Sequence, residues 1–113
     1  GNLYFQIFKS LKFSMDNLEK LAVQLWAVGD EVRLRTLRQL PLNEDCKQRN
    51  NVTELAEALG IPQPTVSHHL RVLRQAGIIR RSKLCRDCYY HLDPAAIEQM
   101  TGNLRDAVLG NER

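Results

Sequence analysis

The spacing of apolar residues predicts two helices near the start of the chain. Over residues 17–28, apolar side chains recur at intervals of three and four, which gives an amphipathic helix. They are Leu18, Leu21, Leu25 and Val28. A second helix is expected over residues 31–40, because Asp30 can cap its start and Pro41 cannot continue it. Its apolar positions are Val32, Leu34, Leu37 and Leu40, with Arg33, Arg35 and Arg38 between them.

Two further helices follow a polar loop expected over residues 42–51. The third is expected to start near Thr53, whose hydroxyl can cap it, and to end at Gly60. The fourth is expected over residues 63–76, after a very short connection. The apolar side chains expected on its buried face are Val66, Leu70 and Leu73. Two short helices joined by a tight turn form a helix-turn-helix unit.

The pattern becomes strand-like after the fourth helix. Residues 78–84 and 88–92 are expected to form two strands joined through Arg86–Asp87 as a β-hairpin. A last helix over residues 94–108 would carry Ile97, Met100 and Leu104 on one side. The expected fold class is therefore mainly α (α+β): a winged helix-turn-helix with a two-stranded β-hairpin wing.

The length of 113 residues fits one small domain, and no apolar run approaches the ~20 residues that would cross a membrane. The stretch Asn2–Gln6 (NLYFQ) looks like most of a tobacco etch virus protease recognition site. Residues 1–14 are therefore expected to be a tag remnant, and residues 15–110 the domain, with Met15 as the native start. Three cysteines without a secretion signal favour the reducing cytoplasm.

The charge of the chain is concentrated in one block. The net charge is only +3, but residues 58–86 contain six basic residues and no acidic one. A block of one sign suggests a polyanion as partner. On the outward side of the fourth helix, five side chains can bond to bases or phosphates of DNA: Gln63, Thr65, Ser67, His68 and Arg71. Basic side chains of the hairpin can contact the DNA backbone: Arg80, Arg81, Lys83 and Arg86.

The adjacent histidines of the fourth helix do not suit a metal site. Neighbouring helix residues point about 100° apart, so His68 and His69 cannot easily bind one ion. We expect His69 to be a partly buried residue with a hydrogen bond near the turn. His68 is expected to face DNA.

Several motifs together resemble those of the ArsR/SmtB family of small dimeric winged-helix repressors. They are DEVRLRTLRQL at residues 30–40, VTELAEALGIPQPTVSHHLRVLRQAGIIRR at 52–81 and CYYHLDP at 88–94. The resemblance implies operator binding through residues 63–76 as recognition helix. It places Gln63, Thr65, Ser67 and His68 at the base-facing positions.

The resemblance also implies a homodimer joined by the first and last helices. The residues expected at that interface are Leu18, Leu21, Leu25, Ile97, Met100 and Leu104. Two amphipathic terminal helices on a domain with a small core support the same expectation. The alternative is that the two helices pack on each other within one chain, and we expect both kinds of packing.

Many members of that family release DNA when they bind a metal or metalloid, but the family's usual sites are missing. The Cys-x-Cys position falls on residues 51–53, which hold no thiol, and the last helix has no histidine. Cys85 and Cys88 flank the predicted turn instead, with Cα atoms expected ~5.5 Å apart, within reach of a disulfide or a shared ion. With Cys46 in the preceding loop they could bind As(III) or Zn. The alternative is that all three cysteines are incidental.

Three other functions are alternatives to a ligand-released repressor. A winged helix can serve as a protein-interaction module without specific DNA binding, although the acid-free block argues against that role. A regulator with no ligand of its own is a second alternative. An enzyme is not expected, because the sequence has no nucleophile–base set, no paired carboxylates and no glycine-rich phosphate loop.

Overall fold

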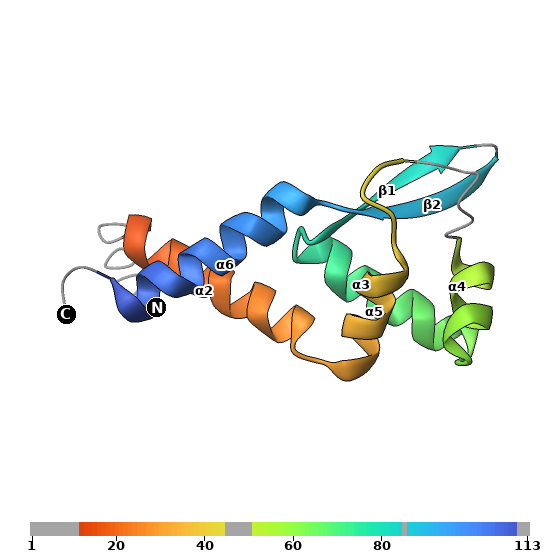
Figure 1. Cartoon of the computed structure of the whole chain (residues 1–113), viewed down its shortest axis with the longest axis horizontal. Coiled ribbons are helices and arrows are strands. Elements are labelled where there is room, and N and C mark those ends of the chain that lie inside the picture. Colours follow the sequence, from red (N-terminus) through yellow and green to blue (C-terminus); the bar gives the residue numbers. More distant parts are fainter. Residues whose placement is uncertain (1–11, 45–50, 85, 111–113) are drawn as a thin grey trace, which may run out of the picture.

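The computed structural model describes residues 12–44, 51–84 and 86–110, with the side chains of residues 12–16 and 84 excepted. Within these residues the chain forms helices and one hairpin (Figure 1). Their bounds are α2 Lys12–Val28, α3 Glu31–Gln39, α4 Val52–Leu59, α5 Gln63–Gln75, β1 Ile79–Leu84, β2 Asp87–Leu92 and α6 Pro94–Leu109. The order matches the winged helix-turn-helix predicted from the sequence. None of the described helices is long and apolar enough to cross a membrane.

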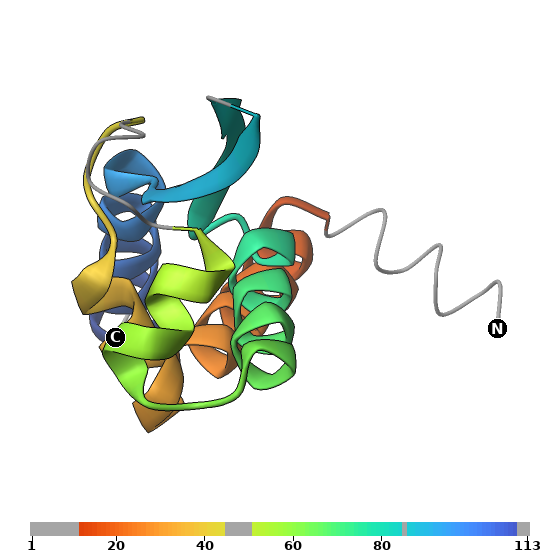
Figure 2. The same ribbon diagram turned by 90° about the vertical axis from the view of Figure 1, so that its right-hand side faces the viewer.

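The long helices and the hairpin lie at opposite ends of the molecule. α2 and α6 lie side by side at one end, while the hairpin and α4 lie at the other (Figure 1). Figure 2 shows α4 and α5 next to each other beneath the hairpin. α2 begins at Lys12 rather than at residue 17, so helical structure extends into the segment expected to come from the tag. The origin of that segment stays a prediction.

The buried face predicted for α5 is confirmed. Val66 and Leu73 are fully buried and Leu70 is 1% exposed. They pack in one core with Leu55 of α4, Ile79 of β1 and Ile78, which lies directly before β1. This core holds the recognition helix of the helix-turn-helix in place, because α5 is short and gains most of its stability from packing.

The apolar pattern of α3 is not buried as its spacing suggests. Leu34 is 50% exposed, whereas Arg33 is only 7% exposed and Thr36 is fully buried. The Thr36 hydroxyl bonds to the Val32 carbonyl within the helix (2.8 Å), so its burial leaves no unpaired group. Arg33 is satisfied by contacts outside its own helix, described below. Of the four apolar positions, Leu40 is buried and Val32 and Leu37 are half-buried, so the pattern predicted the helix but not the exposure of Leu34.

The helix starts are capped by side chains, one of them at a different residue than expected. The Asp30 carboxylate accepts the Arg33 amide (3.0 Å), as predicted, and this bond lowers the pKa of Asp30 below its usual value. α4 is capped by Asn51, whose Oδ1 accepts the amide of Glu54 (2.9 Å). The expectation that Thr53 caps this helix is wrong, because Thr53 already lies inside the helix.

Asn51→Ala should therefore lower the free energy of unfolding by about 1 kcal/mol, the usual cost of losing such a cap. Thr53→Ala is the matched control and should change it by less than ~0.5 kcal/mol, since Thr53 is exposed and makes no cap. Urea unfolding followed by circular dichroism measures both. A cost at Thr53 as large as at Asn51 would contradict this assignment.

The hairpin is paired differently from the register expected. Cys88 lies opposite Lys83 and Leu84 opposite Asp87, so the prediction that Cys85 and Cys88 face each other is wrong. A hydrogen bond at the open end of the hairpin favours the observed register, because the Asp93 amide donates to the Ile78 carbonyl (3.0 Å) just beyond the Ile79–Leu92 pair. The expected register would instead place Ile79 opposite Pro94, which has no amide hydrogen. Both registers leave the same side chains on each face, so alternation alone could not separate them.

Candidate nucleic-acid interface

The outward side of α5 forms a polar and basic surface, which we call the reading face. Its members are Gln63, Thr65, Ser67, His68 and Arg71; all are exposed except Ser67, which is half-buried. The core contacts of α5 hold these side chains outward. The first turn of α5 carries no acidic residue and no side-chain cap, so the positive end of its dipole is open to an anion.

A tight turn sets the angle between α4 and α5. Gly60 ends α4 with φ 69°, a left-handed conformation that glycine adopts readily. The amides of Gly60 and Ile61 both donate to the Ala56 carbonyl (2.9 and 3.2 Å). This closed turn allows α5 to start directly beyond α4, as a helix-turn-helix requires.

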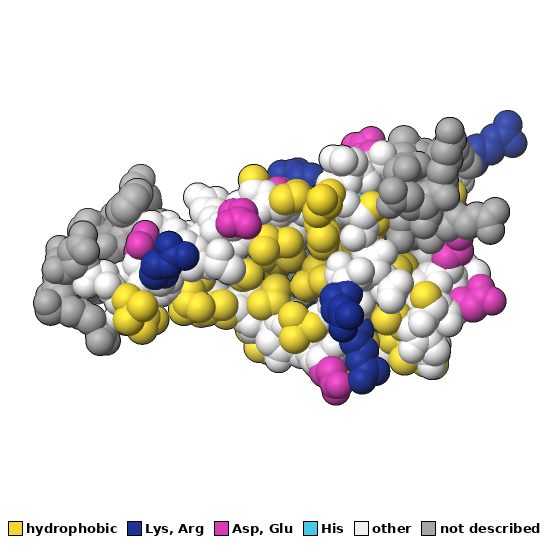
Figure 3. Space-filling view, in the orientation of Figure 1, with side chains coloured by type: hydrophobic (Ala, Val, Ile, Leu, Met, Phe, Trp, Pro, Cys, Tyr) yellow, Lys and Arg dark blue, Asp and Glu magenta, His cyan; other side chains and the backbone are white. Residues whose placement is uncertain are grey.

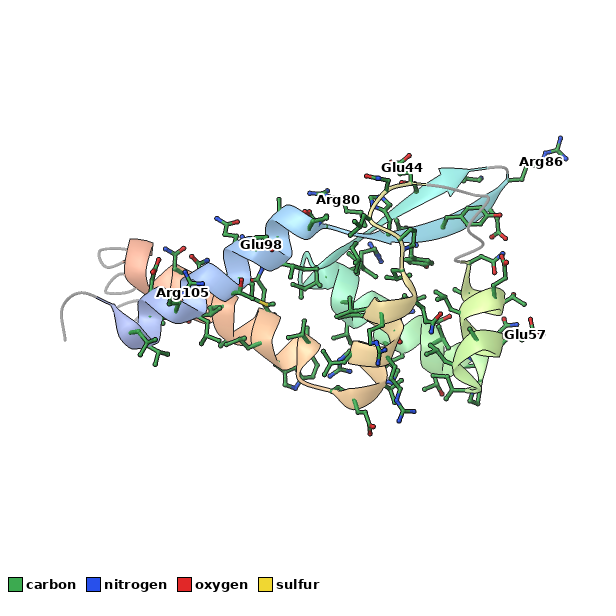
Figure 4. All side chains as sticks on the ribbon, in the orientation of Figure 1. Glu44, Glu57, Arg80, Arg86, Glu98 and Arg105 are labelled. Atoms are coloured by element: carbon green, nitrogen blue, oxygen red, sulfur yellow. The ribbon has the colours of Figure 1, made fainter. Side chains whose placement is uncertain are left out.

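The wing carries positive charge beside the reading face. Arg81, Lys83 and Arg86 are exposed and make no ion pair within the part of the chain that the structure describes. Arg86 sits at the hairpin tip with φ 70° and points away from the body (Figure 4). Arg80 differs, because its guanidinium bonds to the Asp93 carboxylate that caps α6 (2.9 Å). That bond fixes the base of the wing to α6.

Asn51 and Asp87 tie the wing to the helix-turn-helix. The Asn51 amide nitrogen donates to the Asp87 carboxylate (2.9 Å), while the same carboxylate accepts the amide of Cys88 (2.8 Å). One side chain thus caps α4 and holds the second strand. The wing is therefore joined directly to the helix-turn-helix whose second helix carries the reading face.

The histidines behave as their positions predict. His68 is exposed, whereas His69 is half-buried and its Nδ1 lies 3.1 Å from Nη1 of Arg33. Burial is the main cause that lowers the pKa of His69, and the positive charge of Arg33 acts in the same direction. His69 is therefore neutral at neutral pH. The sequence did not identify Arg33 as its partner, because three arginines alternate with apolar residues in α3 and nothing local distinguishes them.

Of the three cysteines in the thiol site predicted from the sequence, the structure describes only Cys88. Cys88 is half-buried and faces Lys83, while Cys46 and Cys85 lie outside the described residues. His91 lies on the face of its strand opposite to Cys88. Its Nε2 has no hydrogen-bond partner within residues 12–44, 51–84 and 86–110, and a carboxylate oxygen of Glu44 is 3.9 Å away. No three His, Cys, Asp or Glu side chains of the described residues come together as a metal site.

Comparisons with known proteins agree with this geometry. The family model described as "Bacterial regulatory protein, arsR family" matches residues 30–81, from the α3 cap into the wing. An HTH-type transcriptional regulator of Methanocaldococcus jannaschii is 39% identical over 69 residues, which are 61% of this chain and 73% of that protein. This chain belongs to the ArsR family. The resemblance seen in the sequence motifs is thereby confirmed.

A further relative and a solved structure are also similar to the chain. A transcriptional repressor SmtB homolog of Synechocystis is 33% identical over 79 residues, 70% of this chain but only 56% of that protein. The solved structure of HlyU from Vibrio cholerae is 30% identical, with a TM-score of 0.61 over 82% of this chain and 96% of that one. As a member of this family, the chain is a DNA-binding transcriptional regulator.

Proposed function

We propose that this ArsR-family regulator represses transcription by binding duplex DNA as a homodimer, with α5 in the major groove. The observation that supports this most directly is the reading face, polar and free of acidic residues, joined to a wing with exposed cations. Gln63, Thr65, Ser67 and His68 would contact base edges. Arg71 and the wing residues Arg81, Lys83 and Arg86 would contact phosphates. Arg80 is bound to Asp93, so we leave it out of the contact set.

The homodimer is proposed from apolar side chains that one chain leaves uncovered. Leu21 and Met100 are buried between α2 and α6 within the chain, and Leu25 and Ile97 are half-buried. Other apolar side chains of the two helices stay exposed: Leu18, Val23, Trp26, Leu104, Val108 and Leu109. Figure 3 shows hydrophobic side chains gathered along α2 and α6. A second copy would cover them and present two recognition helices to neighbouring turns of DNA.

A salt titration tests the DNA contacts. The double variant Arg81→Gln/Lys83→Gln removes two cations from each wing of the proposed dimer. It should therefore reduce the slope of log affinity against log salt by about 4, since each lost phosphate contact removes about one counterion. The binding to a random-sequence duplex is measured by fluorescence anisotropy at several salt concentrations. The matched control is Arg105→Gln, at the other end of the molecule (Figure 4), which should keep the slope.

Two results would contradict the proposal. A double variant with the wild-type slope would show that the wing does not contact phosphates. A wild-type protein that fails to bind duplex DNA would favour the alternative, in which the winged helix docks on another protein. Because the proposed target is chromosomal DNA, we place the site of action in the cytoplasm.

A further inference from the structure

Arg33 is a buried arginine that joins its own helix to two others, α2 and α5. It belongs to α3, and its side chain makes no ion pair with a carboxylate among the described residues. Its Nε donates to the Ala27 carbonyl (2.6 Å), and Nη2 lies 3.5 Å from the Trp26 carbonyl. Both carbonyls belong to the last turn of α2, where the helix dipole is negative. The cation therefore adds to the local bond at this helix end, in which the Gly29 amide donates to the Trp26 carbonyl (3.3 Å).

The same guanidinium is held in orientation by an aromatic ring. Its central carbon lies 5.0 Å from the centroid of the Trp26 ring, within the range of a cation–π contact. Trp26 itself is 63% exposed, on the helix that we propose for the dimer interface. Arg33 is thus oriented by two carbonyls and one ring of α2, which leaves Nη1 to point at α5.

The contact with α5 requires one protonation state of His69. A guanidinium can only donate, so the Nδ1 of His69, 3.1 Å from Nη1, must accept. An accepting Nδ1 means a neutral ring with its hydrogen on Nε2. His69 follows His68 directly on the helix, so a shift of His69 also moves the reading face.

A second buried polar contact joins the same two helices. Gln24 of α2 is 6% exposed, and its Nε2 lies 3.4 Å from the Ala76 carbonyl at the C-terminal end of α5. The recognition helix is therefore linked to α2 near its middle, through Arg33, and at its end, through Gln24. Apolar packing has no preferred direction, so by itself it would allow α5 to shift on the core. The hydrogen bonds of Arg33 and Gln24 are directional and fix the position of α5.

We propose that Arg33 is a positioning residue for DNA recognition: through the neutral ring of His69 it fixes the recognition helix on α2, the helix of the proposed dimer interface. This inference rests on the proposed function. It assigns to Arg33 an effect on base reading rather than on DNA contact, because its charge is buried and cannot reach DNA.

The test compares two affinities of the same protein. The first is the affinity for a duplex that the wild-type protein enriches from a random pool. The second is the affinity for random-sequence duplex. The first divided by the second is the specificity ratio. In His69→Phe, which keeps a ring but removes the acceptor, the ratio should fall about tenfold or more, as expected when one charge-assisted hydrogen bond is lost. Arg33→Lys should act likewise, because a single ammonium cannot span both carbonyls and the histidine.

The affinity for random duplex and its salt slope should stay unchanged in both variants, because no exposed charge is altered. A purely structural defect would lower the folded fraction and reduce both affinities equally, so it cancels from the specificity ratio. His69→Gln offers a neutral acceptor in place of Nδ1 and should restore most of the ratio.

Acid gives an independent test. The charged or titratable groups that act on the His69 ring are Arg33 and His68, which oppose its protonation, and Asp30, which favours it. The pKa of His69 in the folded protein lies below 6.5. The His69 ring therefore binds a proton more readily when the chain is unfolded or when α5 is displaced from α2. As pH falls below about 6.5, the position of α5 on α2 therefore loses stability, and the specificity ratio should fall with it. Because one proton is taken up, the fall is at most about tenfold per pH unit.

The acid-induced fall should vanish in His69→Gln and persist in the matched control His91→Gln, whose histidine lies on the wing. A fall abolished by His91→Gln, or specificity ratios in His69→Phe and Arg33→Lys equal to that of the wild type, would overturn the inference while leaving duplex binding intact. If the wild type enriches no duplex from the pool, the proposed function fails, and this inference fails with it.

Discussion

Leu70→Ala is expected to lower the free energy of unfolding by about 3 kcal/mol. Leu70 is 1% exposed and packs in the middle of the core that joins α5 to the rest of the chain. Truncation there removes buried apolar surface and leaves a cavity that the short helices cannot easily close. In a small domain such a loss is a large part of the total stability.

Leu34→Ala is the matched control. Leu34 belongs to the apolar pattern of α3 in the sequence, yet it is 50% exposed in the structure. Its truncation should change the free energy of unfolding by less than ~0.5 kcal/mol. Urea unfolding at low protein concentration measures both variants. Equal losses would show that the Leu34 side chain is buried, which contradicts the structure.

Leu104→Glu is expected to convert the proposed dimer into a monomer and to weaken binding to the enriched duplex about a hundredfold or more. Leu104 is 39% exposed on α6, so the fold of one chain tolerates the carboxylate, whereas a dimer interface would bury it. A monomer loses the second half-site, whose contribution to affinity comes from its high effective concentration.

Analytical ultracentrifugation and anisotropy titrations measure these two effects. The matched control is Leu42→Glu, at a residue that is 61% exposed beyond the end of α3, which should leave both the mass and the affinity unchanged. A Leu104→Glu protein that remains dimeric and binds DNA normally would place the interface elsewhere. A monomeric wild type would exclude the dimer proposed from α2 and α6.

Local signals predicted the parts of the DNA-reading unit. Gly60 and the short connection to Gln63 marked the turn, and the spacing of Val66, Leu70 and Leu73 marked the buried face of α5. These signals are reliable because helical periodicity and helix ends depend on neighbouring residues. The same local reading predicted Thr53 as the cap of α4, whereas Asn51 caps it in the structure; both side chains can accept an amide hydrogen.

The sequence by itself determined the order of the helices and hairpin, the exposed polar face of α5 and the acid-free block from residue 58 to 86. Each depends on residues close in the chain or on charge alone. Only the tertiary structure decided that Arg33 is buried and Leu34 exposed, that Lys83 rather than Cys85 faces Cys88, and that Arg80 is bound to Asp93. Those outcomes depend on groups brought together from distant parts of the chain. The carbonyls of α2 and the ring of His69 make burial of an arginine favourable, and no pattern within α3 encodes them.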